Sequence, residues 1–122
     1  MKTSDNIYDL VKNASTFAQI TPGSYYLDKP LQIPQKASQA GIFRLICWGA
    51  TFYCSSHLFD SPTDVLVTGG TFFLGSNNVF ATSEQQESLT AFFEYSVIVT
   101  PSSNWETQPA QGLNWHCESL GL

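Results

Sequence analysis

Two Cys–His pairs in this sequence have the residue types that bind zinc. Cys54 and His57 enclose two serines, and His116 and Cys117 are adjacent near the end of the chain. Two thiolates and two imidazoles would hold zinc tetrahedrally if the last segment folded back onto the loop after Tyr53. The spacing matches no established zinc finger, and adjacent residues of a strand point to opposite faces. We therefore expect buried cysteines, surface histidines and no cofactor.

Acidic residues could supply the two carboxylates of a glycoside hydrolase, which stand about 5–9.5 Å apart. Asp60 and Asp64 share one polar loop, and Glu84 and Glu87 share another. Neither pair has a visible partner acid on a neighbouring repeat. Glu94 stands alone in an apolar run, where it faces solvent if its two neighbours point inward.

A polysaccharide lyase needs a cationic base or a metal beside an acidic sugar. Arg44 is the only arginine, and alternation directs it outward between Phe43 and Leu45. A salt bridge or a partner contact is the favoured role for it. The sequence also lacks a Gly-x-Ser-x-Gly elbow, a phosphate loop and a dinucleotide fingerprint. We predict no catalytic residue and no enzyme.

Aromatic side chains offer binding rather than catalysis. Trp48 is one position out of phase with the inward Leu45 and Cys47, and an outward tryptophan can stack on a sugar or anchor a protein interface. The alternative is that Trp48 fills a corner between sheets. Phe52, Phe72 and Phe73 are expected to stack in the core. The candidate partner-binding residues are Trp48, Arg44, Glu94 and Trp105.

Composition limits the possible partners. A chain of 122 residues forms one domain with a modest core. Apolar residues make up 43% of it and charged residues only 12%, which argues against disorder and predicts a surface rich in Ser, Thr, Asn, Gln and Gly. A net charge of −5 disfavours nucleic acid, which needs clustered Lys and Arg, and permits an acidic face directed at a basic partner.

The cellular location is predicted from what the sequence lacks. The segment Met1–Ile7 has no apolar run of the signal-peptide type, and no stretch approaches the roughly 18 apolar residues of a membrane span. The three cysteines are scattered, which fits reduced thiols better than a disulfide framework. We expect a cytoplasmic protein with no membrane partner.

A repeat of about twenty residues positions all of these candidates. Leu45–Tyr53 and Val65–Phe73 share three apolar residues, a spacer, a small pair, threonine and two aromatics. Units this short cannot bury an apolar face alone, so they stack on their neighbours. Two columns are predicted from the period: Tyr25, Leu45 and Val65, and Leu27, Cys47 and Val67.

The segments on either side of this repeat complete a single domain, residues 1–122. Residues 4–18 are predicted as one helix, because their apolar positions follow the spacing of a buried face; these are Ile7, Leu10, Val11, Ala14 and Phe17. Such a helix would cover the open strand edges of the first coil. Residues 20–100 supply the coils, and a polar excursion lengthens the last of them until Val97–Val99 takes the place of Thr71–Phe73. Residues 101–122 form a strand or loop cap.

The order of these motifs resembles the opening of right-handed parallel β-helices of the pectate-lyase-like superfamily. The helix is followed by Pro22-Gly-Ser-Tyr-Tyr-Leu27, by Pro30-Leu-Gln-Ile33 and by a strand ending in Gly49-Ala-Thr-Phe52. The resemblance covers roughly residues 5–75 and implies an all-β fold, a short solenoid of about four to five coils with a capping helix. That superfamily includes polysaccharide lyases, glycoside hydrolases and phage tailspikes, but the matching residues are structural rather than catalytic.

Three functions are therefore open. The first is a non-catalytic binding protein that blocks or sequesters a macromolecular partner through a solenoid face; a small phage or mobile-element inhibitor of a host system is of this type. The second is a glycan-binding or tailspike-like module that uses Trp48, Tyr53 and Trp105. The third is a minimal carbohydrate-active enzyme. The compact acidic chain without a catalytic motif favours a protein partner, with a glycan as the alternative. A homo-oligomer is also open, because so short a stack leaves its last coil in need of cover.

Overall fold

Short parallel strands make up most of the structure. The computed structural model describes residues 5–75, 78–99 and 115–118. Every strand pair within those ranges is parallel. The described part of the chain is thus rich in β-sheet, with few helices, as the sequence predicts. None of its helices is long and apolar enough to cross a membrane.

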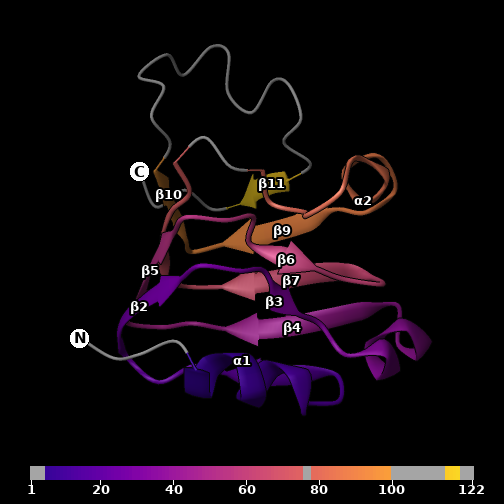
Figure 1. Cartoon of the computed structure of the whole chain (residues 1–122), viewed down its shortest axis with the longest axis horizontal. Coiled ribbons are helices and arrows are strands. Elements are labelled where there is room, and N and C mark those ends of the chain that lie inside the picture. Colours follow the sequence, from indigo (N-terminus) through magenta and orange to yellow (C-terminus); the bar gives the residue numbers. More distant parts are fainter. Residues whose placement is uncertain (1–4, 76–77, 100–114, 119–122) are drawn as a thin grey trace.

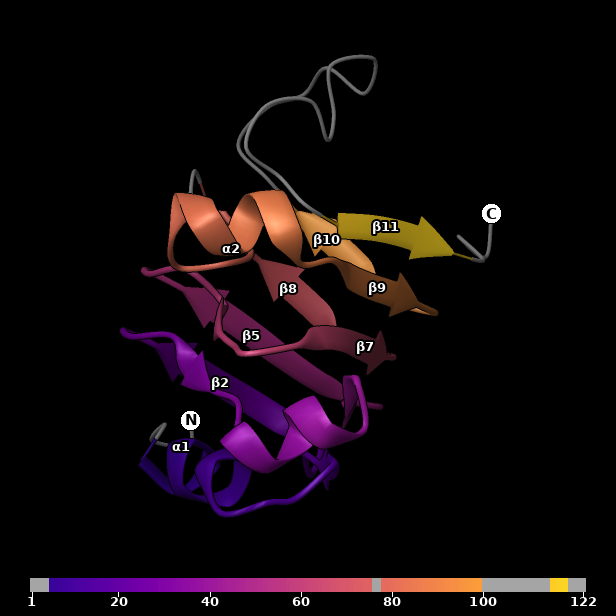
Figure 2. The same cartoon turned by 90° about the vertical axis from the view of Figure 1, so that its right-hand side faces the viewer.

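The strands form three sheets in which elements distant in sequence lie side by side (Figure 1). The first sheet has five strands, in the order β1 (Phe17–Gln19), β4 (Ile42–Ile46), β7 (Asp64–Thr68), β9 (Ala91–Glu94) and β11 (Trp115–Glu118). The second, which rises through the centre of Figure 2, has four: β2 (Gly23–Leu27), β5 (Ala50–Cys54), β8 (Thr71–Phe73) and β10 (Val97–Val99). The third pairs β3 (Leu31–Gln32) with β6 (Phe59–Asp60).

The stacking register follows the predicted period of 20 residues between β5 and β8 and departs from it elsewhere. Phe52 pairs with Phe72, at the expected distance of 20 positions. Leu45, however, pairs with Val67, 22 positions on. The two predicted columns that relied on a constant period are therefore wrong, and Tyr25 lies beside Phe52 in the other sheet.

The corner between β4 and β5 explains this difference. Ile46 and Thr51 are five positions apart, whereas their partners Thr68 and Thr71 are only three apart. The first of these corners thus holds two more residues than the second. The two extra residues in this turn let both sheets stay in register while the spacing between repeats changes.

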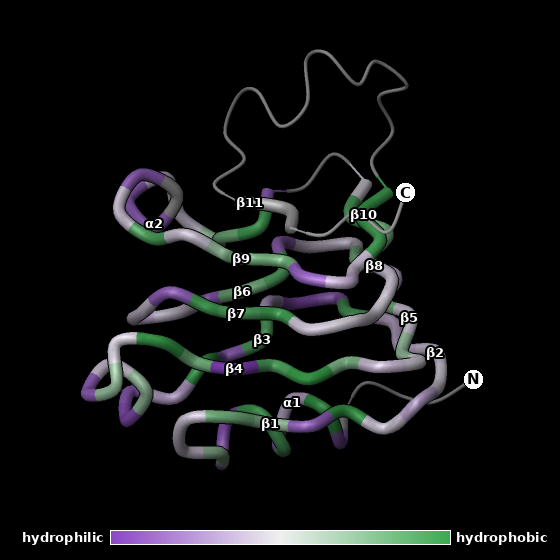
Figure 3. Tube along the Cα trace, turned by 180° about the vertical axis from the view of Figure 1, so that it is seen from behind, coloured by the Kyte–Doolittle hydropathy of each residue, from purple (hydrophilic) through white to green (hydrophobic). Residues whose placement is uncertain are grey.

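The coil from β8 to β10 is longer than the coil of 20 residues before it, as expected. Val97–Val99 pairs with Thr71–Phe73 at an offset of 26 positions, which confirms the predicted placement. The added length contains helix α2 (Ser83–Ser88), which begins after Thr82, whose side chain accepts a hydrogen bond from the backbone N–H of Gln85. Seen from behind, this largely hydrophilic helix projects from the side of the stack (Figure 3).

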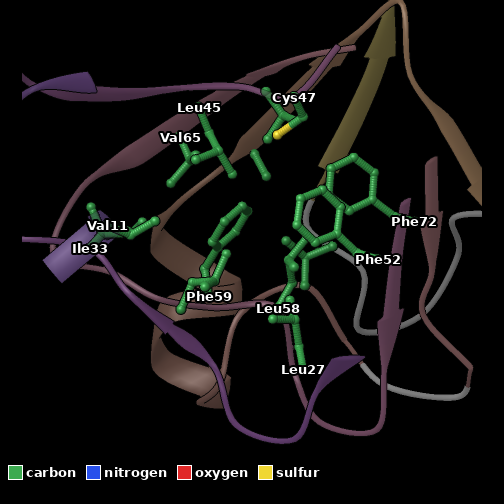
Figure 4. Close-up of a cluster of buried hydrophobic side chains, with 14 of the residues drawn as sticks. Val11, Leu27, Ile33, Leu45, Cys47, Phe52, Leu58, Phe59, Val65 and Phe72 are labelled. Atoms are coloured by element: carbon green, nitrogen blue, oxygen red, sulfur yellow. The ribbon is translucent and has the colours of Figure 1, made fainter. Parts of the chain in front are cut away.

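The core lies between the three sheets and consists of the inward side chains of their strands (Figure 4). Phe52 stacks on Phe72 with 4.8 Å between ring centroids, and Phe72 meets the ring of Phe93 edge-on at 5.4 Å. Leu58 and Phe59 fill the side of the third sheet. Burying each of these large side chains contributes about 1.5–3 kcal/mol, so the inward columns hold the stack together.

The N-terminal helix is shorter than the 4–18 predicted from the sequence. Helix α1 spans Asp5–Lys12 and buries Ile7 and Val11, but Leu10 is exposed. Phe17 lies outside the helix, in β1, where 57% of its surface is exposed. The apolar residues of 4–18 follow a helical period only in their first half.

Pairing with a neighbouring strand determines the structure of the second half of residues 4–18. Ala18 is buried, whereas Phe17 and Gln19 are exposed, which is the two-residue period of a strand. The backbone of this segment pairs with Arg44–Ile46 of β4. The hydrogen bonds gained from that pairing outweigh the helical propensity of so short a segment.

A tyrosine fixes α1 at one end of the stack. The hydroxyl of Tyr8 donates to Oδ1 of Asp28 at 2.9 Å and accepts the backbone N–H groups of Asp28 and Lys29. The Lys29 ammonium lies 4.6 Å from the centre of the same ring. Helix α1 thereby lies beneath the first coil, at the bottom of Figure 1.

Candidate binding surface

The outer face of the second sheet carries a column of exposed aromatic and aliphatic side chains. Alternation along each strand directs one residue outward at the same height, and the register aligns these residues from strand to strand. We call this column the ladder: Tyr26, Tyr53, Phe73 and Val99. All four are exposed, and Tyr26 retains 53% of its accessible surface.

The rings of the ladder stack on one another. Tyr53 and Phe73 are nearly parallel, with centroids 4.9 Å apart and planes at 8°. Tyr26 and Tyr53 are 5.2 Å apart and tilted by 33°. The strand spacing of a parallel sheet, about 4.8 Å, imposes this separation. The ring faces between these residues therefore cover each other, and their edges point to solvent.

A second column on the same face contains no charge. Ser24, Thr51 and Thr71 are half-buried and Val97 is exposed. Together with the ladder, these eight outward positions contain no acidic or basic residue. In a protein with a net charge of −5, this uncharged face is suited to an apolar or neutral contact.

Trp48 lies beside this face, at the corner between β4 and β5. Its side chain is 53% exposed, which favours the outward placement over the alternative in which Trp48 fills a corner between sheets. The indole rests on Gly69: a Cβ built on that glycine would lie 2.7 Å from Cε3 and 2.8 Å from Cδ2 of the ring. The two extra residues of this corner push Trp48 out and across the next coil.

Tyr95 continues this aromatic surface onto the following coil. Its ring centroid lies 5.8 Å from that of Trp48, with the planes at 39°, and its side chain is 58% exposed. The backbone of Tyr95 has φ +56°, and no other non-glycine residue described has a positive φ. The register places it above Gly69, which has φ +77°. A bulky residue thus occupies a conformation that the preceding coil gives to glycine.

Glu94 precedes Tyr95 and is half-buried. Its Oε2 accepts a hydrogen bond of 2.7 Å from the hydroxyl of Thr68, the residue beside it on β7. Its carbonyl oxygen accepts the N–H of Gly69 at 2.9 Å. The hydroxyl of Ser96 lies 2.8 Å from the Gly69 carbonyl. We use the term corner cluster for Trp48, Gly69, Glu94 and Tyr95, which these contacts hold together.

Arg44, another predicted partner-binding residue, lies elsewhere. It faces outward from β4, as alternation predicts, between Phe17 of β1 and Leu66 of β7. That position belongs to the outer face of the first sheet, with β7 between Arg44 and the strand of Glu94. The structure therefore brings Trp48 and Glu94 to one place and leaves Arg44 apart. Trp105 lies outside the described residues.

Of the four candidate metal ligands, Cys54 and His57 have described side chains. Cys54 is buried at the end of β5, and burial raises the pKa of its thiol to about 12. His57 uses Nδ1 to accept the backbone N–H of Asn78 at 3.2 Å. His116 and Cys117 belong to β11 in the first sheet, where their backbones pair with β9, and nothing is described of their side chains. The described residues contain no group of three potential metal ligands.

Asp60 and Asp64, two of the candidate acids, accept hydrogen bonds from neighbouring coils. Asp60 accepts hydrogen bonds from the side-chain amides of Gln32, at 2.9 Å, and Gln85, at 2.8 Å. Asp64 accepts the backbone N–H of Thr90 at 2.9 Å. Both carboxylates thus link successive layers of the stack.

The sequence analysis did not propose five exposed members of this surface as binding residues: Tyr26, Phe73, Tyr95, Val97 and Val99. Phe73 was expected in the core with Phe72, but it lies on the exposed ladder. Adjacent residues of a strand face opposite sides, so only one of two consecutive aromatics can point inward. That rule was a usable signal for Phe73. The sequence gives no comparable signal for Tyr95, because its exposure depends on a positive φ.

No family model, curated protein or solved structure matches this chain significantly. Its function is therefore inferred from the surface itself.

Proposed function

We propose that the chain is a short right-handed parallel β-helix of about four to five coils, of the pectate-lyase-like type, with α1 as its N-terminal cap. The uniformly parallel pairing and the three sheets support this fold. So does the return of the chain to each sheet after 20 to 28 positions.

On this scaffold the protein acts as a non-catalytic binding protein that blocks or sequesters a macromolecular partner. A small phage or mobile-element inhibitor of a host system is a protein of this kind. One observation carries the proposal: in the described part of the chain, seven of the nine exposed large apolar residues lie on the ladder, at Val97 or in the corner cluster. Contiguous exposed apolar surface of this kind marks interaction sites in soluble proteins.

The ladder favours a protein over a sugar. A pyranose stacks on the face of an aromatic ring, but the ladder rings cover one another's faces at 4.9 and 5.2 Å. Their exposed edges suit aliphatic or aromatic side chains, which pack against ring edges in protein interfaces. The uncharged column beside them adds no desolvation penalty for charged groups.

Trp48 supports the alternative, a glycan-binding or tailspike-like module. One face of its indole rests on Gly69 and the ring remains half exposed, which is the arrangement of a sugar platform. Weak sugar binding that Trp48→Ala abolishes would favour this function. A sugar panel that shifts no NMR signal would remove it.

The test is affinity capture from host-cell lysate, comparing the tagged chain with two double variants. Tyr53→Ser with Phe73→Ser removes the centre of the ladder. Leu10→Ser with Phe17→Ser removes two exposed apolar groups from α1 and β1 as a control; these are 47% and 57% exposed, against 36% and 37% for Tyr53 and Phe73. Circular dichroism verifies that both variants fold.

We expect one protein, retained in stoichiometric amount by the wild type and the control and lost by the ladder variant. Equal retention by all three, or background alone, would overturn the proposal. Capture of untagged copies of the chain itself, sensitive to the ladder variant, would identify the partner as a second protomer.

A further inference from the structure

The corner cluster combines two aromatic rings with a carboxylate, and this is the chemistry of a cation site. We propose that it binds an arginine side chain of the protein partner. The inference rests on the proposed binding function and specifies the chemistry of the partner at one point of the surface.

The aromatic part of the site comes from two coils. Trp48 covers Gly69 with one face of its indole and is half exposed, while Tyr95 stands against it at 5.8 Å and 39°. The face of an aromatic ring is the negative side of its quadrupole, and indole attracts cations most strongly. The two rings are tilted by 39° to each other, and both side chains are more than half exposed, so ring surface remains open to solvent.

The carboxylate of Glu94 supplies the charge. One of its oxygens accepts a single hydrogen bond, from Thr68, whereas an ionised carboxylate has about four acceptor positions. That bond holds the side chain against β7, and the contact between the Glu94 carbonyl and Gly69 places the main chain of Glu94 next to the glycine on which the indole of Trp48 rests. No basic residue belongs to the corner cluster, and the chain as a whole carries a net charge of −5. The charge complement of this site is therefore a cation.

Arginine satisfies both parts of the site at once. Its planar guanidinium can lie on an indole while its N–H groups donate to a carboxylate in a bidentate arrangement. A lysine ammonium is a compact, strongly hydrated charge and gains less from the flat ring. A neutral sugar would use the ring but not the negative charge.

The backbone of Tyr95 gives an independent reason to assign function to this corner. A tyrosine with φ +56° is strained relative to the glycine that takes the same place one coil earlier. Such strain persists where the surrounding structure over-determines it, and it concentrates at functional sites. Here the strain carries a ring outward, against Trp48.

The experiment is an NMR titration of the isotope-labelled full chain, following the indole N–H of Trp48 and the backbone N–H of Gly69, which remains when Trp48 is replaced. That signal is assigned among the three tryptophans from the spectrum of Trp48→Phe. The probes are a peptide of three Gly-Arg repeats, a peptide of three Gly-Lys repeats, and cellobiose. Glu94→Gln tests the carboxylate, and Glu84→Gln, on α2, removes one negative charge away from the site as the matched control.

We expect the arginine peptide to bind about two- to fivefold more tightly than the lysine peptide, and to lose about that factor in Trp48→Leu. Glu94→Gln should weaken the arginine peptide more than Glu84→Gln does. Equal affinity for the two peptides, or equal losses in the two charge variants, would overturn the inference. A shift of the indole signal by cellobiose alone would assign the platform to a glycan instead.

This inference and the proposed function can fail separately. If the captured partner still binds Trp48→Leu and Glu94→Gln but not the ladder variant, the binding function stands and the arginine site falls. Loss of the partner in both sets of variants supports both.

Discussion

Gly69 combines two properties that a larger residue would lose. Its φ of +77° lies in the left-handed region, and its α-carbon supports the indole of Trp48. A methyl group there would meet two ring atoms at less than 3 Å and the Cα of Trp48 at 3.2 Å. The exposure of Trp48 is thus linked to the absence of a side chain on the next coil.

Gly69→Ala should therefore destabilise the fold by more than its backbone strain. The left-handed conformation alone costs an alanine about 1–2 kcal/mol, and displacement of the indole adds to this. Gly41→Ala is the matched control, because Gly41 has φ +80° and a Cβ there would meet nothing within 4 Å. Urea unfolding of both variants measures the difference.

A double-mutant cycle tests the contact between the indole of Trp48 and Gly69. In a Trp48→Ser background the added methyl has no indole to displace, so the cost of Gly69→Ala should fall toward that of Gly41→Ala. An unchanged cost in that background would mean that the indole does not rest on Gly69 in solution.

At the scale of elements, the sequence predicted strands better than their spacing. The shared run of threonine and two aromatics correctly pairs Thr51 with Thr71, because both strands leave their corners in the same phase. The same period misplaced Leu45 by two positions, since two extra residues in a turn leave no trace in the apolar pattern. Trp48, the residue out of phase with Leu45 and Cys47, lies where the extra residues are, but the sequence alone does not show that it marks them.

The helix shows a similar limit. Ile7 and Val11 were correctly assigned to its buried face, but Phe17 fits a helical period and a strand period equally well. Only the neighbouring β4, 27 positions away along the chain, decides between them. Such a long-range contact is invisible to a local pattern.

Removal of α1 should cause aggregation rather than a simple loss of binding. A chain starting at Asn13 would uncover the core beneath Ile7 and Val11 and leave the first strands without their cover. Size-exclusion chromatography with light scattering checks this. A soluble, monodisperse truncation would contradict the capping role.

Tyr8→Phe provides a graded control for that experiment. It keeps the ring but removes the hydroxyl that bonds Asp28 and Lys29. We expect a loss of about 1 kcal/mol in unfolding free energy, as for a few exposed hydrogen bonds, with the protein still monodisperse.

At the scale of the whole molecule, the charged residues lie outside the uncharged face of the second sheet, and acidic residues outnumber basic ones. The ladder and the column beside it carry no charge, while the chain has a net charge of −5 and places Glu94 at the edge of that face. Apolar contact supplies affinity that salt hardly weakens, whereas the acidic field steers a basic partner and is screened within about 8–10 Å at ordinary ionic strength.

Association with the captured partner should therefore slow as salt increases, while dissociation changes little. Raising sodium chloride from about 0.05 M to about 0.5 M should lower the association rate constant by roughly tenfold or more for a basic partner, because steering is lost, and the ladder contacts should keep the lifetime of the complex. Surface plasmon resonance separates the two rates.

The ladder variant, Tyr53→Ser with Phe73→Ser, should have the opposite effect: it should shorten the lifetime of the complex at every salt concentration with little effect on the association rate. If salt instead accelerates dissociation as strongly as it slows association, charge rather than the aromatic ladder holds the complex together.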